Sequence, residues 1–162
     1  MSIYILSRPI HSGKTTELMQ WSNLQNNIHG ILMPDISGSR KILNLDTKEI
    51  FEAECVDITN TKLSITSIGK FNFYTDAFEK ANSIILHALS QNPRWLVIDE
   101  VGKLEISGKG FYVSVEDAIK IYGDKDKPGD LLITVRDSLC VEVVSFFNIK
   151  NYKIISKLNE TK

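Results

Sequence analysis

Two short stretches of the sequence carry residue types that bind phosphate groups and metal ions. The first, Ser7 to Thr16, reads SRPIHSGKTT. It nearly matches the pattern G-x-x-x-x-G-K-[ST], whose backbone N–H groups surround phosphate oxygens, but Arg8 stands in place of the first glycine. The second stretch, Asp99-Glu100, directly follows the apolar run Trp95 to Ile98. Together these residues predict a site where phosphate groups and a metal ion meet.

Each residue type has an expected role in such a site. Lys14 would reach the β- and γ-phosphates, and the Thr15 hydroxyl would ligate Mg²⁺. Asp99 would hold the same ion, directly or through water, while Glu100 would orient and deprotonate an attacking water. The residues expected to surround the phosphates are Arg8, Pro9, Ile10, His11, Ser12, Gly13, Lys14, Thr15 and Thr16.

Simpler interpretations compete with these roles. A GK[ST] triplet arises by chance in many proteins, so Lys14 could be a solvated lysine in the first turn of a helix. An acid pair after an apolar strand can also cap a helix or lie at a solvated edge.

A third contribution follows from topology. P-loop folds with a hydrophobic-Asp-Glu pair commonly place a further strand between the loop strand and the acid strand, and LLITVR is the candidate. The end of that strand, Thr134 to Arg136, would then face the γ-phosphate, where Arg136 would stabilise charge on the transferred group. A surface arginine at a strand end is an equally good interpretation of Arg136.

The elements expected around the first stretch are a strand and a helix. Residues 2–6 predict a short buried strand, and residues 14–27 have the spacing of an amphipathic helix that Gly30 closes as a left-handed cap. Two alternating segments, 41–45 and 49–54, predict a β-hairpin beside the main sheet.

The rest of the chain continues to alternate, apart from residues 62–73, whose pattern is ambiguous. The expected elements are a helix from Thr75, the N-cap, to 92, a strand at 95–98, a helix at 111–123, a turn-rich linker at 124–130, a strand at 131–135, a helix at 137–149 and a strand at 152–156. This order predicts one α/β domain, residues 1–162, with a mostly parallel twisted sheet flanked by helices and the hairpin as an insertion.

Composition narrows the class of protein further. The 19 Lys+Arg residues nearly balance the 20 Asp+Glu residues, so no basic excess favours nucleic acid or an anionic membrane as partner. Cys55 and Cys140 are isolated, which fits a reducing compartment and argues against a disulfide framework or a cysteine-built zinc site. No apolar run has the length of a membrane span, and the N-terminus lacks a signal-peptide pattern. We expect a soluble cytoplasmic protein; no pattern indicates a preferred base or an oligomeric state.

The segment WLVIDEVGKLEISGKGF, with the loop, HGILMPDI and IGKFNFYTDAFEKA, resembles the small P-loop nucleoside-triphosphatase family. This family is described in thermophiles as THEP-type nucleoside triphosphate phosphohydrolases, and it includes the cancer-related nucleoside triphosphatase. The resemblance is strongest at Asp99, Glu100, Gly102, Lys103 and Glu105, which match D-E-x-G-K-x-E. It implies a RecA-like α/β fold and slow, Mg²⁺-dependent hydrolysis of ATP, GTP and other nucleoside triphosphates. It also implies phosphate and Mg²⁺ binding by Gly13, Lys14 and Thr15, metal binding by Asp99 and general-base catalysis by Glu100.

The loop departs from the family pattern G-P-P-G-x-G-K-T-T, because Arg8 and His11 replace two glycines. If the backbone at Arg8 requires glycine, the replacement costs about 1–3 kcal/mol of strain. His11 could donate a hydrogen bond to phosphate, obstruct its approach, or be only a loop side chain, the interpretation we favour. Lys103 and Glu105 could form a local ion pair that steadies the loop after the strand.

Two other functions remain open. The segment PIHSGKTTEL is also similar to the PMFSGKTEEL type of loop in type II thymidine kinases. Those enzymes add a cysteine-bound zinc lobe that two lone cysteines cannot supply, and VGKLE is not their pattern, so a nucleoside kinase ranks second. A nucleotide-binding switch without significant turnover would keep Lys14 and Asp99 but would not need Glu100.

Overall fold

A mostly parallel sheet runs through the centre of the protein, whose computed structural model describes residues 2–124 and 126–161. Eight strands of these residues form it, in the order β10-β1-β9-β8-β2-β4-β3, with β5 paired to β4. The strands from β10 to β2 run parallel, and the pairs that involve β4 are antiparallel. The strands are β1 (Ile3–Arg8), β2 (Ile28–Leu32), β3 (Asp35–Ile36), β4 (Ser39–Asn44), β5 (Ile50–Glu52), β8 (Trp95–Ile98), β9 (Asp130–Arg136) and β10 (Tyr152–Ile155).

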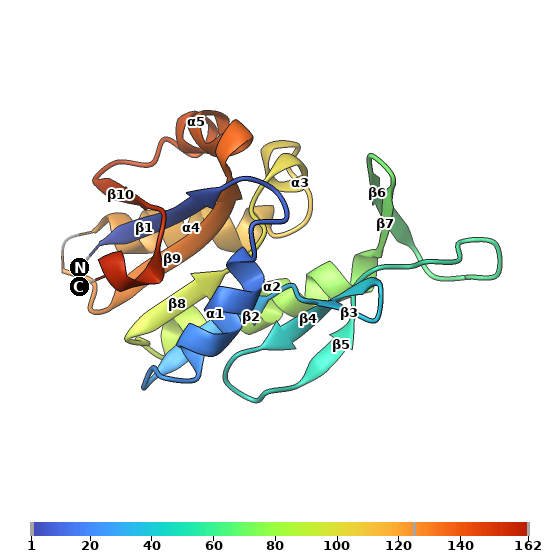
Figure 1. Cartoon of the computed structure of the whole chain (residues 1–162), viewed down its shortest axis with the longest axis horizontal. Coiled ribbons are helices and arrows are strands. Elements are labelled where there is room, and N and C mark those ends of the chain that lie inside the picture. Colours follow the sequence, from blue (N-terminus) through green and yellow to red (C-terminus); the bar gives the residue numbers. More distant parts are fainter. Residues whose placement is uncertain (1, 125, 162) are drawn as a thin grey trace.

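Helices cover both faces of this sheet (Figure 1). One face packs against α1 (Lys14–Ser22) and the short helix η1 (Leu158–Glu160), and the other against α2 (Thr75–Ser90), α4 (Tyr112–Gly123) and α5 (Asp137–Phe146). Successive residues of β8 therefore point into different cores, Leu96 and Ile98 toward α2 and Trp95 and Val97 toward α1. The predicted α/β fold is confirmed.

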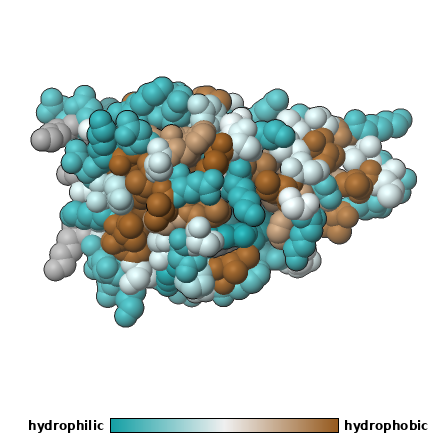
Figure 2. Space-filling model, turned by 90° about the horizontal axis from the view of Figure 1, so that it is seen from above, coloured by the Kyte–Doolittle hydropathy of each residue, from teal (hydrophilic) through white to brown (hydrophobic). Residues whose placement is uncertain are grey.

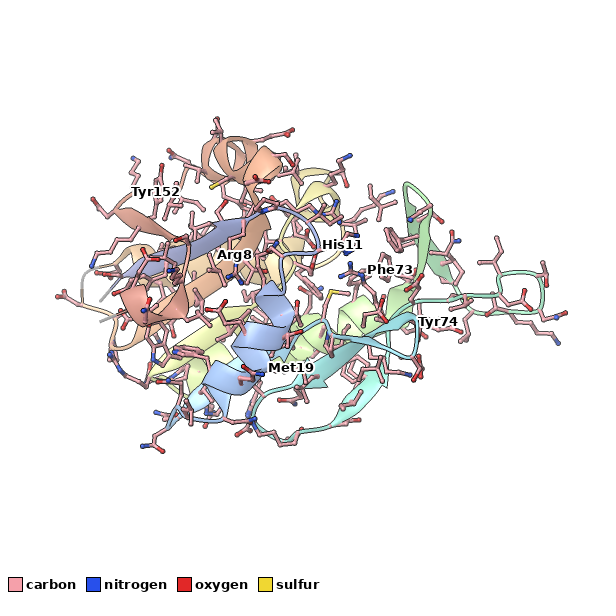
Figure 3. All side chains as sticks on the ribbon, in the orientation of Figure 1. Arg8, His11, Met19, Phe73, Tyr74 and Tyr152 are labelled. Atoms are coloured by element: carbon pink, nitrogen blue, oxygen red, sulfur yellow. The ribbon has the colours of Figure 1, made fainter. Side chains whose placement is uncertain are left out.

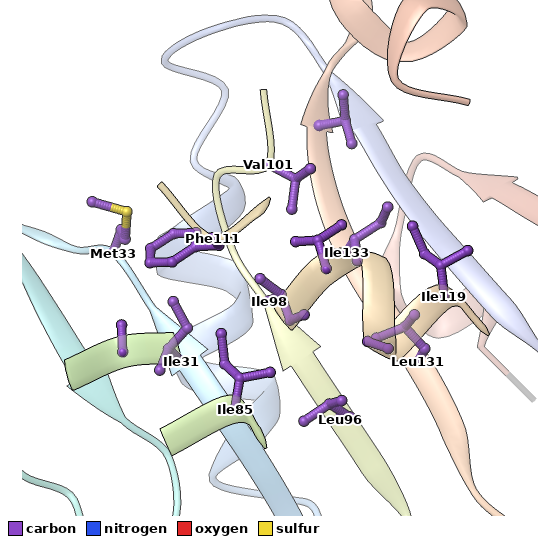
Figure 4. Packing of buried hydrophobic residues seen from close by; sticks show 14 of the residues in the cluster. Ile31, Met33, Ile85, Leu96, Ile98, Val101, Phe111, Ile119, Leu131 and Ile133 are labelled. Atoms are coloured by element: carbon purple, nitrogen blue, oxygen red, sulfur yellow. The ribbon is translucent and has the colours of Figure 1, made fainter. Parts of the chain in front are cut away.

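Figure 4 shows the core on the α2 and α4 face at close range. Ile85 of α2 and Ile119 of α4 pack against side chains of β2, β8 and β9, all of them buried. The strand predicted between the loop strand and the acid strand is β9, which pairs with β1 on one side and with β8 on the other. The ends of β1, β9 and β8 therefore lie side by side.

The predicted hairpin is present as β4–β5, but it belongs to the main sheet. Ile31 pairs with Asn44 and Leu32 with Leu43, so β4 continues the sheet from β2. The ambiguous segment forms a second, separate hairpin of β6 (Ile65–Ile68) and β7 (Phe71–Tyr74), which projects from the body (Figure 1). Sequence alternation alone could not assign it because β6, with the sequence ITSI, does not alternate apolar and polar residues.

The helix predicted over residues 14–27 ends at Ser22, and Gly30 is not its cap. Gly30 lies within β2 with φ 110°, and a Cβ there would lie 2.0 Å from the carbonyl oxygen of Val97. The close approach of β2 to β8, rather than a helix end, is what requires glycine at this position.

Several further boundaries differ slightly from expectation: α2 ends at Ser90, α4 begins at Tyr112 and α5 ends at Phe146. Tyr74 takes the cap position of α2, and Thr75 begins the helix while its hydroxyl bonds to Ser64, just before β6, and to Thr66 of β6. The predicted linker at 124–130 does connect α4 to β9, and Lys125 within it lies outside the described residues.

The surface seen from above carries its hydrophobic residues in separate patches between hydrophilic side chains (Figure 2). Among residues 2–124 and 126–161, every helix is too short or too polar to cross a membrane.

A buried acid holds the segment after β8 in place. Glu105 lies in α3 (Lys103–Ile106), a short helix that sequence analysis did not predict, and accepts backbone N–H bonds from Gly102 and Phe111, each at 2.8 Å. Its side chain is 2 % exposed, and this burial raises the pKa of the carboxyl to about 7. Glu105 thus binds backbone amides, whereas the exposed Lys103 does not provide the local ion pair that the sequence suggested.

The raised pKa of Glu105 predicts a pH-dependent stability. Because burial raises the pKa from 4.5 in the unfolded chain to about 7, the folded state binds more protons between these values. The free energy of unfolding therefore falls as pH rises through this window, by roughly 3 kcal/mol for this carboxyl. Urea unfolding at a series of pH values from about 5 to 8, without nucleotide or metal, measures it.

Glu105→Gln isolates this contribution because glutamine does not titrate. The unfolding free energy of the variant minus that of the wild type should become more positive as pH rises, whatever other groups contribute. A difference that stays constant with pH would contradict the assignment.

Candidate active site

The predicted phosphate loop joins β1 to α1 at the carboxyl ends of the parallel strands. Within it, His11 has φ 58° and Gly13 has φ 79°, both in the left-handed region. Arg8 is the last residue of β1 and pairs with Arg136 of β9, so its backbone is extended. The strain that glycine loss was expected to place at Arg8 therefore falls at His11 instead.

A cavity of about 220 Å³ lies over this loop. Its loop wall is made by residues 10–16, with the exposed His11 side chain at the surface. The rest of its lining includes Asp35, Arg40, Glu100 and Arg136. The fold thus brings most of the predicted loop residues together with the predicted acid and arginine, while Arg8 and Pro9 do not line the cavity.

Arg8 points away from this cavity. Its Nη1 forms an ion pair of 2.7 Å with Glu17 in the first turn of α1. Figure 3 shows Arg8 at the end of β1 and His11 farther along the loop. The side chain of Arg8 therefore links the loop strand to the helix, and any contact between Arg8 and phosphate would have to come from its backbone.

Lys14 is buried under the loop. Its Nζ donates hydrogen bonds to the carbonyl oxygens of Arg8, at 3.0 Å, and Pro9, at 2.9 Å. Burial lowers the pKa of Lys14 and is the largest effect, while the negative charges of Glu100 and Asp99 oppose it. The ammonium group therefore lies at the loop and within the electric field of both acids, and a solvated surface lysine is the wrong interpretation.

Asp99 is fully buried at the end of β8 and is surrounded by hydrogen-bond donors. Its Oδ2 accepts from the Thr15 hydroxyl at 2.8 Å and the Met33 N–H at 3.1 Å. Its Oδ1 accepts from the Thr134 hydroxyl and the Glu100 N–H, the latter at 3.0 Å. Burial raises the pKa of this carboxyl, the charge of Glu100 adds to the rise, and the hydrogen bonds partly offset it.

Thr15 and Asp99 together offer the hard oxygen ligands that suit a small divalent cation. Among the described residues no group of three or more His, Cys, Asp or Glu side chains could hold a metal ion on its own. This arrangement fits Mg²⁺, which protein sites usually bind through one or two oxygen ligands plus substrate phosphates and waters.

Glu100 lies next to this pair with a strained backbone. Its φ of 62° is unusual for a non-glycine residue and turns the chain sharply after β8. Its backbone N–H also donates to the Thr134 hydroxyl at 2.8 Å, which fixes the turn against β9. The carboxylate lines the loop cavity and forms an ion pair of 3.2 Å with Nη1 of Arg40.

Sequence analysis missed two residues of this site. Arg40 of β4 reaches Glu100, and the backbone of Met33, just after β2, binds Asp99. Met33 lies within the segment HGILMPDI, but no motif gave either residue a role in the site, because each contributes through the pairing of distant strands. Thr134, which was expected near the γ-phosphate, donates its hydroxyl to the Asp99 carboxylate and accepts the backbone N–H of Glu100, so it holds Asp99 and the turn after it in place.

Solved structures with the same fold support this arrangement of elements. The crystal structure of THEP1 from the hyperthermophile Aquifex aeolicus aligns with 20% identity and a TM-score of 0.70, covering 99% of this chain and 92% of that chain. The solution structure of a human cancer-related nucleoside triphosphatase aligns with 18% identity and a TM-score of 0.65, covering 95% and 87%. At these identities the likeness shows the fold, which is that of P-loop NTPases.

The family itself is shown by the sequence. No curated protein matches the chain at a significant level. Residues 3–158 match the protein family described as NTPase, a match that includes the phosphate loop, the acid pair and every element of the sheet. Because this match spans nearly the whole chain, the protein belongs to the NTPase family.

Proposed function

We propose that the protein binds a nucleoside triphosphate, ATP or GTP, together with Mg²⁺, and slowly hydrolyses it to the diphosphate and phosphate. The observation that carries this proposal is the 2.8 Å contact between the Thr15 hydroxyl and the buried Asp99 carboxylate, with Glu100 next in the chain. Two motifs that lie far apart in the sequence meet at this contact. They combine the phosphate loop, the two expected metal ligands and the expected base, which are the parts that phosphoryl transfer uses.

Binding would use the loop and its lysine. Backbone N–H groups of residues 10–16 at the N-terminus of α1 would surround the phosphates, since the helix dipole favours negative charge there. Lys14 would exchange its bonds to the loop carbonyls for phosphate oxygens. Thr15 and Asp99 would hold Mg²⁺, which neutralises charge on the phosphates when bound.

Hydrolysis would depend on Glu100. Its carboxylate would take a proton from water, the water oxygen would attack the γ-phosphorus, and the bond from that phosphorus to the bridging oxygen would break as the diphosphate leaves. Arg136 lines the same cavity and would stabilise charge on the transferred group. Slow turnover is expected because Arg40 occupies the Glu100 carboxylate, and this ion pair must loosen before Glu100 can act as a base.

Replacing Glu100 by glutamine separates chemistry from binding. In Glu100→Gln the side chain keeps its shape but cannot accept the proton of water, so phosphate release should fall at least about 100-fold. The rise in melting temperature caused by nucleotide and Mg²⁺ should remain. A phosphate-release assay with several nucleotides, combined with thermal unfolding, measures both.

Glu79→Gln is the matched control, because Glu79 lies exposed on α2 away from the cavity and its loss should change neither value. Phosphate release that persists in Glu100→Gln would exclude Glu100 as the base. If the wild type is stabilised by nucleotide but releases no phosphate, the protein is a switch; transfer of the phosphoryl group to a nucleoside would make it a kinase.

Loss of Lys14 should abolish binding. Lys14→Ala removes the cation expected at the β- and γ-phosphates, so the stabilisation by nucleotide, about 2.7 kcal/mol at 100 times Kd for a binding-competent protein, should disappear. Differential scanning fluorimetry with and without ATP and Mg²⁺ measures it. Lys109→Ala, an exposed lysine outside the cavity, should respond like the wild type. A nucleotide-induced shift that survives in Lys14→Ala would exclude the site.

A further inference from the structure

A second, larger cavity adjoins the loop cavity. Its volume is about 340 Å³, within the range of small-molecule sites of about 300–1,000 Å³. The hairpin β6–β7 and the segment from Glu100 to Phe111 form its walls. Met33, Arg40, Glu100 and Arg136 line both cavities, so the second space opens onto the same Glu100 side chain as the first.

A chain of aromatic rings lines this second cavity. The ring centroids of Phe71 and Phe73 are 6.2 Å apart and stacked, those of Phe73 and Phe78 are 5.4 Å apart, and those of Phe78 and Phe111 are 5.2 Å apart. Phe111 also lies beside Met33 (Figure 4), and Phe73 lies at the base of the hairpin (Figure 3). Such a wall offers a planar ring both stacked and edge-to-face contacts.

The charged residues of the cavity favour an anion. Its lining contains four cationic side chains, Arg40, Lys70, Lys103 and Arg136, against two acids, Glu100 and Glu105. Glu105 uses both oxygens on backbone N–H groups, and Glu100 is paired with Arg40. In a chain of net charge −1 this is a local positive site.

The cations and the rings are close together. The guanidinium of Arg40 lies 5.6 Å from the centroid of the Phe71 ring, and Nζ of Lys70 lies 5.4 Å from it. A ligand whose ring packs near Phe71 would therefore bring an attached anionic group within reach of both cations. The cavity therefore offers aromatic rings to the planar part of such a ligand and cations to its anionic group.

We propose that this cavity binds a second small molecule, a planar aromatic ring that carries an anionic group, with the ring against Phe71, Phe73 and Phe78 and the anion near Lys70 and Arg40. Its occupant is distinct from the nucleotide. This distinction rests on the proposed function, because Glu100 acts at the γ-phosphate and the base lies at the opposite end of the triphosphate. An occupant beside Glu100 takes up space from which water would approach.

Two fluorescent probes of nearly the same shape test the site. Anilinonaphthalene sulfonate has two ring systems and an anion, and N-phenylnaphthylamine lacks only the sulfonate. Titrated into the full chain without nucleotide, the sulfonate probe should bind saturably with one site per chain. Lys70→Glu should raise its Kd about fivefold or more, because an attraction becomes a repulsion, and should leave the Kd of the neutral probe unchanged.

Matched variants separate the cavity from the rest of the surface. Lys62→Glu makes the same charge change at an exposed lysine outside the cavity and should have no effect on either probe. Phe71→Ala should weaken both probes, whereas Phe146→Ala, a half-exposed ring outside the cavity, should weaken neither. Lys70 is exposed, so its replacement tests the site even if Phe71→Ala fails to fold.

The phosphate-release assay distinguishes an occupant of this cavity from the nucleotide. The sulfonate probe should lower kcat for phosphate release without raising KM for the nucleotide. Displacement of the probe by ATP would identify the cavity as the pocket for the nucleotide base. Displacement by a single-stranded oligonucleotide would identify it as a nucleic-acid surface. Either result overturns the proposal, and so does binding of the probe to Lys70→Glu with the same Kd as to the wild type. If the probe binds as expected but the wild type releases no phosphate, the proposed hydrolysis fails and this site remains.

Discussion

The arrangement of the site depends on the hydrogen-bond donors that surround one buried carboxylate. Asp99 is fully buried, and an acid in such surroundings is stable only with hydrogen-bond donors around it. The donors are the hydroxyls of Thr15 in α1 and Thr134 in β9, the backbone N–H of Met33 just after β2, and the backbone N–H of Glu100. Thr15, Met33 and Thr134 come from segments far apart in the sequence, so the strand order of the sheet is what brings them to Asp99, whereas Glu100 is its neighbour in the chain. The same contacts bring the Thr15 hydroxyl to one oxygen of Asp99 and the backbone of Glu100 to the other, and the proposed metal-assisted hydrolysis would use all three residues.

Two residues carry backbone strain at this site, and both line the loop cavity. His11 and Glu100 both have left-handed φ angles, although neither is glycine. Such conformations cost on the order of 1–3 kcal/mol each and persist only where surrounding contacts hold them. Hydrogen bonds hold Glu100, because its N–H contacts both Thr134 and Asp99. His11 lies in an exposed loop, so the glycine replacement changes the energy of the loop more than the position of the acids.

The parts of the fold that could be predicted from the sequence are those whose pattern lies within one short segment. The apolar run Trp95 to Ile98 is a strand buried on both faces, and residues 75–90 form the amphipathic helix that their spacing indicated. Gly30 was misassigned because glycine after a helix and glycine under a close strand contact look alike in a sequence. The structure distinguishes them, since a Cβ at Gly30 would lie 2.0 Å from the carbonyl oxygen of Val97. Arg40 was missed for a related reason, since its role depends on the order of strands β4, β2 and β8 in the sheet, which no single segment of the sequence reveals.

The hairpin of β4 and β5 shows why that pairing matters for function. Arg40 reaches Glu100 only because β4 pairs with β2, which in turn pairs with β8. A guanidinium can donate to a carboxylate while its face lies near an aromatic ring, and Arg40 has both partners, Glu100 and Phe71. The β4–β5 hairpin therefore contributes to the site itself. Its Arg40 lines both cavities and pairs with the Glu100 carboxylate, which also lines both.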